Sequence, residues 1–165
     1  MLAAQVVRSA LEVDAPPDGG VEVAVLLEGV PEGVERRVAT TRRLLGGDAT
    51  VSDTCPAWWS AYPWSRGDVG LKLTATLSRV PPLLAAAEAA RERCGAPLAV
   101  RGSAGAGVRY AGLPGATDPD VVARVVEELR TAARDAAGHA IVLKCSPDSA
   151  RPTSRHARTT TGTGR

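Results

Sequence analysis

The chain contains no phenylalanine, and only three tryptophans and two tyrosines are spread over its 165 residues. The hydrophobic core must therefore be built from valine, leucine and alanine, which bury less area per side chain than aromatic residues do. A chain of this length corresponds to one domain, or to one lobe of a larger protein. We therefore expect an isolated copy to be only marginally stable.

Cysteine is also scarce. Cys55, Cys94 and Cys145 lie far apart, and none belongs to a Cys-x-x-Cys pair. This spacing argues against a disulfide framework and against a metal site, and it favours small buried hydrophobic side chains in a cytoplasmic protein. No hydrophobic run approaches the roughly 18 residues of a membrane helix, and no basic segment precedes a hydrophobic block at the N-terminus. The sequence thus predicts neither a membrane span nor a signal peptide.

The chain has no strong excess of charge of either sign, since its formal net charge is +2. Four arginines and no acidic residue fall in residues 150–165, and removing them leaves a body with a net charge of −2. A slightly acidic body argues against a nucleic-acid-binding core. Residues 150–165 also lack hydrophobic periodicity, which predicts a disordered basic tail. There are two alternatives to a merely solvated tail. The segment could bind phosphate or nucleic acid, or it could be an out-of-frame end.

The hydrophobic pattern alternates between strands and helices. Strands are predicted at 21–28, 71–78, 97–101, 107–113 and 140–145. Helices are predicted at 31–45, 81–94 and 118–138, because each begins near proline and ends at glycine. Val21, Val23, Val25 and Leu27 alternate with other residues, so they should share one buried strand face.

The predicted order is therefore strand, helix, strand, helix, strand, strand, helix, strand. Short connections favour an α+β fold, a mostly antiparallel sheet with the helices packed on one face and a ferredoxin-like character. Residues 48–70 form an irregular insert that holds all three tryptophans, Trp58, Trp59 and Trp64. An aromatic cluster that anchors this insert is favoured over a cover for a cofactor.

Several segments, in this order, carry a resemblance to a known family. They are the strand 21–28 with its helix ending in Leu-Leu-Gly-Gly, the tryptophan-containing insert, the Leu-Lys-Leu-Thr strand at 71–74, the Gly-Ser-Ala-Gly-Ala-Gly-Val-Arg-Tyr join at 102–110, and the helix before Ile-Val-Leu-Lys at 141–144. Taken together, residues 10–149 resemble the C-terminal, substrate-facing lobe of the FAD-linked oxidases, and in particular the FAD-binding subunit of bacterial glycolate oxidase.

The resemblance implies FAD as cofactor, a small 2-hydroxy acid or alcohol as substrate, and hydride transfer to the flavin. It also implies that a separate FAD-binding domain or other oxidase subunits hold most of the FAD. Residues 1–14 would then be a remnant of such a preceding domain, residues 15–149 the C-terminal-like lobe, and residues 150–165 the disordered tail. On this interpretation the chain is a fragment of an oxidoreductase and does not hold FAD alone.

Four side chains are candidates for contacts with substrate or flavin. Lys72 lies on the strand face opposite the leucines, where a cation can hold a carboxylate or stabilise a reduced flavin. A lysine on a solvated sheet face is the alternative. Arg101 and Arg109 flank the glycine-rich join and can each bind a carboxylate, or extend into water. Tyr110 can donate its hydroxyl to substrate, or cover the edge of the core.

Two glycines of the join are candidates for close approach of the backbone to a cofactor. Gly105 and Gly107 carry no side chain, which would let the backbone reach a flat ring, although turn geometry alone also explains them. The join lacks the strand–Gly-x-Gly-x-x-Gly–helix context of a dinucleotide fold. No Ser-His-Asp order and no cluster of metal ligands is visible.

Two other classes of function remain open. One is a ferredoxin-like ligand-binding or regulatory module without enzymatic activity, which predicts a stable homodimer. The other is an inactive fragment of an oxidase, which predicts poor solubility because a face made for another domain would be exposed.

Overall fold

The computed structural model describes residues 8–46 and 48–145. Within these residues six strands form one sheet, accompanied by three α-helices and a short 3-10 helix. In chain order the elements are β1 (Ala10–Ala15), β2 (Glu22–Leu26), α1 (Pro31–Leu45), β3 (Val69–Thr74), η1 (Leu77–Arg79), α2 (Val80–Cys94), β4 (Ala99–Ser103), β5 (Val108–Leu113), α3 (Pro119–Asp135) and β6 (Ala140–Lys144). The predicted tail at 150–165 and residues 1–7 lie outside the described part.

The strands are arranged in the order β2-β1-β4-β5-β3-β6, and every neighbouring pair is antiparallel. From β3 to β6 the chain follows strand–helix–strand–strand–helix–strand, with the sheet order β4-β5-β3-β6, which is the ferredoxin-like arrangement. The β1–β2 hairpin extends this sheet beyond β4. The predicted α+β fold with a ferredoxin-like character is thus confirmed.

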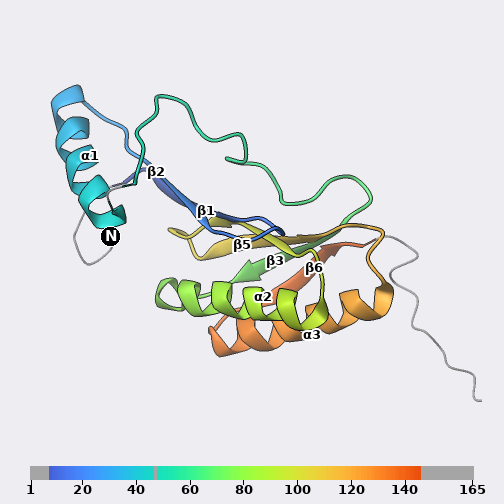
Figure 1. The fold of residues 1–165 in the computed structure, drawn as a ribbon. Helices are drawn as coiled ribbons and strands as arrows, with labels where there is room; N and C mark the ends of the chain where they lie inside the picture. Colours follow the sequence, from blue (N-terminus) through green and yellow to red (C-terminus); the bar gives the residue numbers. More distant parts are fainter. Residues whose placement is uncertain (1–7, 47, 146–165) are drawn as a thin grey trace, which may run out of the picture.

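Helices α2 and α3 lie side by side on one face of the sheet (Figure 1). The hydrophobic side of α3 is buried, since Val122, Val125, Val126, Leu129 and Ala133 all face inward. Asp118 caps this helix, because its side chain accepts hydrogen bonds from the first-turn amides. The buried cluster under the two helices consists of valine, leucine, alanine and one cysteine, without an aromatic side chain among its described members.

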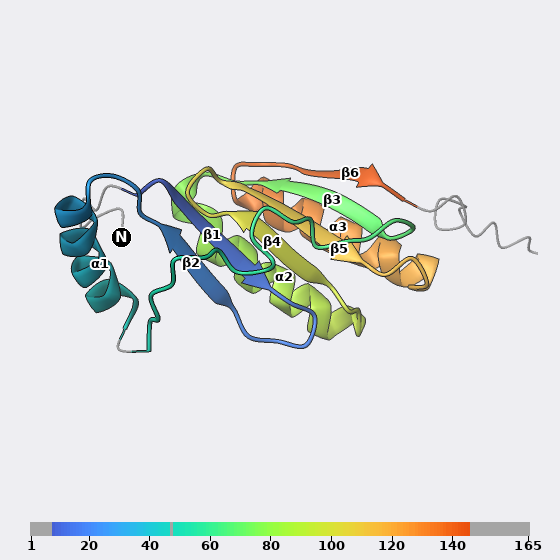
Figure 2. The same ribbon diagram turned by 90° about the horizontal axis from the view of Figure 1, so that it is seen from above.

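The first helix differs from the other two. Helix α1 lies beyond one end of the β1–β2 hairpin, away from α2 and α3 (Figure 2). Thr41 is its one buried residue, and Leu45 is 41% exposed. Arg37 connects this helix to the segment after β2, because its Nη2 donates a hydrogen bond to the carbonyl of Glu28, while its Nε donates to the carbonyl of Gly33 within the helix. With a single buried residue, α1 has no hydrophobic face wide enough to pack against the sheet.

Two predictions about burial are wrong. Val23 is 44% exposed because it lies on the edge strand β2, and Val21, which precedes this strand, is 59% exposed. Cys94 is buried in the core as expected, but Cys55 and Cys145 are exposed. Cys55 lies in the insert, and Cys145 directly follows the edge strand β6. No helix in the described part of the chain covers either cysteine.

The strand predicted at 71–78 is shorter than expected. It corresponds to β3, which ends at Thr74, after which the chain continues into η1 and α2. Residues 10–14, expected at the end of a preceding domain, pair with both β2 and β4 as the second strand of the sheet. No helix of the described residues combines the length and the hydrophobicity needed to cross a membrane.

Candidate functional site

The sheet face that points away from α2 and α3 carries a row of polar residues. Lys72 pairs with Tyr110, Tyr110 with Arg101, and Arg101 with Asp14, across β3, β5, β4 and β1. Residues directly opposite each other in neighbouring strands project to the same face. Three of the four predicted contact residues, Lys72, Tyr110 and Arg101, therefore lie in one row. Ile141 on β6 pairs with Lys72 and extends this row. We call the row, including Asp14 and Ile141, the open-face site.

The insert between α1 and β3 crosses this open face (Figure 1). Trp64 lies on Gly70, where a Cβ atom would come within 2.8 Å of the tryptophan ring. Tyr62 stacks on Trp64 with ring centres 4.7 Å apart, and Tyr110 meets both rings edge-on. Trp58 holds another part of the insert, since its Nε1 donates to Glu22 Oε2 at 2.8 Å. The insert is thus anchored by aromatic residues and forms a wall beside the site.

Arg101 is already bound to an internal carboxylate. Its Nε and Nη2 donate to the two carboxylate oxygens of Asp14 at 2.8 and 3.1 Å, and Asp14 is only 6% exposed. The remaining nitrogen, Nη1, lies 3.5 Å from the carbonyl oxygen of Tyr62. Because Asp14 occupies one edge of the guanidinium in a bidentate manner, Arg101 supports the site and is not free to bind the carboxylate of a ligand.

Lys72 is different, because it is half-buried and has no ion pair or hydrogen bond with any described residue. Its neighbours across the strands are Tyr110 on one side and Ile141, which is 52% exposed, on the other. Burial, and secondarily the hydroxyl of Tyr62, raise the pKa of Tyr110, so its phenol stays a hydrogen-bond donor at neutral pH. The site therefore presents a cation, a hydroxyl donor and a hydrophobic side chain in one row.

Arg109 lies on the opposite face of the sheet. It pairs with Leu73 and Gly102, and the whole residue is buried with 0% exposure. Its Nη2 lies 3.4 Å from the carbonyl oxygen of Gly107, while Nε and Nη1 have no partner among the described residues. Burial lowers the pKa of this guanidinium. The structure thus separates Arg109 from Lys72, Arg101 and Tyr110.

The two candidate glycines have different environments. Gly107 has φ +73°, and a Cβ there would collide with the carbonyl oxygen of Ala75. Gly105 has no such restriction, and a Cβ at this position would meet Arg8 and Leu11 at an ordinary 3.5 Å. Turn geometry and close chain packing therefore explain Gly107, whereas Gly105 has room for a methyl group.

Sequence reasoning missed two acidic residues of the open face. Asp14 and Glu12 alternate on β1, and Glu12 pairs with Ser103 on β4. Burial raises the pKa of Glu12, and its hydrogen bond with Ser103 partly opposes this shift. The alternation of acidic and hydrophobic residues at 11–14 was a visible signal for a strand with one polar face.

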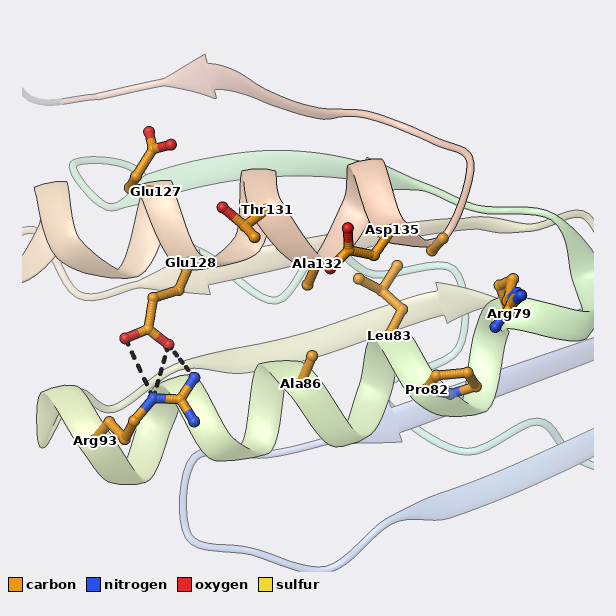
Figure 3. A pocket seen from close by; sticks show the side chains of 11 residues that line it. Arg79, Pro82, Leu83, Ala86, Arg93, Glu127, Glu128, Thr131, Ala132 and Asp135 are labelled. Carbon is orange, nitrogen blue, oxygen red and sulfur yellow. Dashed lines mark hydrogen bonds and ion pairs between the residues drawn. The ribbon is translucent and has the colours of Figure 1, made fainter.

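Two cavities lie away from the open face. One, of about 490 Å³, runs between α2 and α3 and is lined by charged residues at both ends, including the ion pair of Arg93 and Glu128 (Figure 3). The other, of about 290 Å³, lies between α2 and the β1–β2 hairpin. Neither is lined by Lys72 or Tyr110, and the residues that the structure describes contain no group of His, Cys, Asp and Glu suited to a metal ion.

No protein-family model, no curated protein and no solved structure matches the chain. Function must therefore be inferred from the fold and from the open-face site themselves.

Proposed function

We propose that the chain is the substrate-side lobe of a cytoplasmic FAD-dependent oxidoreductase, similar to the FAD-binding subunit of glycolate oxidase. The enzyme would oxidise a small 2-hydroxy acid or alcohol by hydride transfer to the flavin. The observation that carries the proposal is Lys72, a half-buried cation without an ion pair or hydrogen bond to any described residue, directly opposite Tyr110 on the neighbouring strand. The free cysteines agree with a reducing compartment.

Lys72 would bind the carboxylate of the substrate. A half-buried ammonium group is screened less by water than an exposed one, so its attraction for a carboxylate is stronger. Tyr110 would donate a hydrogen bond to the same molecule, and Ile141 would contact its carbon skeleton. Together the three side chains can orient a small hydroxy acid on the sheet face.

Arg101 acts as a positioning residue in this proposal. Through Asp14 it joins β1 to β4, and through its Nη1 it reaches the carbonyl of Tyr62 in the insert. Tyr62 in turn packs against Tyr110. The ion pair thereby holds the aromatic wall beside the site and limits access of water to Lys72 and Tyr110.

The open face suits only the ring end of FAD. A bound flavin would accept the hydride, and the cation of Lys72 fits the negative charge that a reduced ring carries. The described residues do not fit the pyrophosphate. Each of the three helices has proline in its first turn, which removes backbone N–H groups that bind phosphate at a helix N-terminus. A separate FAD-binding domain or oxidase subunit would therefore hold the dinucleotide.

The test combines the purified chain with the N-terminal FAD domain of a similar oxidase and follows flavin absorbance and turnover of glycolate. The chain offers a matched control, because Lys72 and Lys144 are its two lysines. Lys72→Met should raise KM for glycolate about tenfold to a hundredfold, the loss of one charge-assisted hydrogen bond. Lys144→Met removes the same charge from a side chain that is bonded to the carbonyl of Ser65, and its KM for glycolate should stay within about twofold of the wild-type value.

Three outcomes decide between the classes of function. Flavin binding and turnover only with the added domain, lost selectively in Lys72→Met, would support the substrate-side lobe. A folded homodimer that binds no flavin with or without the domain would favour a ligand-binding or regulatory module. An aggregating chain that neither binds flavin nor gains solubility from the domain would indicate an inactive fragment.

A further inference from the structure

Arg109 is an anomaly of the helix side of the sheet. Its guanidinium is fully enclosed, with Nε and Nη1 unpartnered among the residues that the structure describes. The third nitrogen, Nη2, donates to the carbonyl oxygen of Gly107 at a long 3.4 Å, and this oxygen already accepts from the backbone N–H of Ala75 at 3.0 Å. The positive charge is therefore compensated by no carboxylate of the described chain.

Such an arrangement is unfavourable as it stands. An arginine keeps its charge at any pH that a protein experiences, so it cannot become neutral on burial as a lysine can. A buried charge without a partner is strongly destabilising, and folded proteins pair such charges almost without exception. The enclosed guanidinium of Arg109 therefore points to a counter-charge that comes from outside the described chain.

The acidic side chains nearest to Arg109 in the fold do not neutralise its charge. Two acidic residues belong to this end of the sheet. Glu12 lies on the open face, and Asp135 lines the groove between α2 and α3. Neither is bonded to Arg109.

The segment that precedes the strand of Arg109 is the β4–β5 hairpin, residues 104–107. In this segment two glycines flank an exposed alanine, Ala106. Two backbone N–H groups of the segment donate to the carbonyl of Leu11, a third donates to Ser103 Oγ, and the carbonyl of Gly107 accepts from the backbone N–H of Ala75. Because Arg109 is fully buried, a ligand would reach its guanidinium only if a segment of this kind opened.

We propose that this end of the sheet is an anion-binding site for a carboxylate or phosphate group, with Arg109 as its buried cation and residues 104–107 as the neighbouring segment that would open to admit the ligand. The site lies on the helix side, so it is separate from Lys72 and from the substrate site proposed above. Its ligand would accept a charge-assisted hydrogen bond from Nε or from Nη1. Binding of that ligand would stabilise the folded chain by mass action.

The test is a thermal unfolding series on the full chain with sodium phosphate, with sodium acetate, and with sodium chloride at equal ionic strength. At ten times the dissociation constant, the binding anion should raise Tm by about 3–6 °C above the chloride control. Arg109→Met should abolish this shift and be no less stable than wild type without anion, because it removes an unpaired buried charge. Arg130→Met removes the same charge from an exposed helix position and should keep the full shift.

A response to acetate and phosphate alike would identify a carboxylate site, and a response to phosphate alone a phosphate site. An equal shift in wild type and Arg109→Met would overturn the proposal, because the anion would then bind elsewhere. If Arg109→Met does not fold, calorimetric titration of the wild-type chain with phosphate and with acetate decides the question. Binding of one anion per chain is expected, and no heat above that of chloride would also overturn the proposal.

Discussion

The carboxylate of Asp14 accepts two hydrogen bonds from the guanidinium of Arg101, at 2.8 and 3.1 Å, at the junction of β1 and β4. This junction is where the β1–β2 hairpin meets the ferredoxin-like part of the sheet. The same guanidinium reaches the carbonyl oxygen of Tyr62. One ion pair thereby connects the hairpin, the central strands and the insert.

Removing the charge of Asp14 should be costly. Asp14→Asn leaves Arg101 largely buried without its carboxylate, and we expect a loss of about 3 kcal/mol in the free energy of unfolding. Urea denaturation at neutral pH measures the loss. Asp18→Asn, in the exposed turn between β1 and β2, is the control and should change stability by less than about 0.5 kcal/mol. Equal effects of the two substitutions would show that the pair contributes nothing.

A methyl group at Gly112 should displace the insert. Its Cβ would collide with the carbonyl oxygen of Pro63, so Gly112→Ala should cost about 1–3 kcal/mol and move Trp64 off the sheet. Tryptophan fluorescence should shift to the red as the ring becomes hydrated. Gly33→Ala, within α1 and with its Cβ at an ordinary 3.5 Å from Val30, is the control and should stabilise by up to about 1 kcal/mol. An unshifted emission in Gly112→Ala would contradict the packing of Trp64.

The two glycines of the β4–β5 hairpin should respond differently. Gly107→Ala combines a left-handed backbone with a collision against Ala75 and should cost about 1–3 kcal/mol. Gly105→Ala should leave stability within about 0.5 kcal/mol, because its backbone conformation and space both admit alanine. If Gly105 also serves the approach of a flavin, Gly105→Ala should weaken flavin binding in the reconstituted enzyme while the urea midpoint stays unchanged.

Glu12 should make stability depend on pH in the opposite sense to a salt-bridged acid. Burial raises its pKa in the folded state, so folding favours the protonated form. Its contribution is complete below the ordinary glutamate pKa of about 4.3 and is lost as pH rises through the higher folded value. Glu12→Gln should therefore be more stable than wild type at pH 7 and equal to it near pH 4. Urea midpoints of both proteins at the two pH values measure this effect. If the difference between Glu12→Gln and wild type were the same at both pH values, the raised pKa of Glu12 would be refuted.

The local elements followed from the sequence. The helix over 119–135 was predictable from Asp118, Pro119 and five inward-facing residues at helical spacing, and the helix ending at Cys94 from its prolines and Gly95. Strand alternation likewise placed Lys72 opposite the leucines of the same strand. Each of these signals acts within a few residues, so it needs no knowledge of the rest of the fold.

Burial at the edges and the partners of charged residues did not follow from the sequence. Val23 alternates as well as the leucines of β3, but it is exposed because it lies on the outermost strand, beyond α2 and α3. Arg101 and Arg109 look equivalent in the sequence. The register of β4 against β1 gives Arg101 a carboxylate, whereas Arg109 projects from the other side of β5 into the core.

The order of the elements from β2 onward, the composition of the core and the polar face of β3 follow from the sequence alone. The tertiary structure was needed to bring Lys72, Tyr110, Arg101 and Asp14 into one row, and to enclose Arg109 with its Nε and Nη1 unpartnered among the described residues. The physical reason is strand register. It is set by contacts between residues far apart in the chain, such as Glu12 and Ser103, and a shift of one residue would reverse which face every side chain occupies.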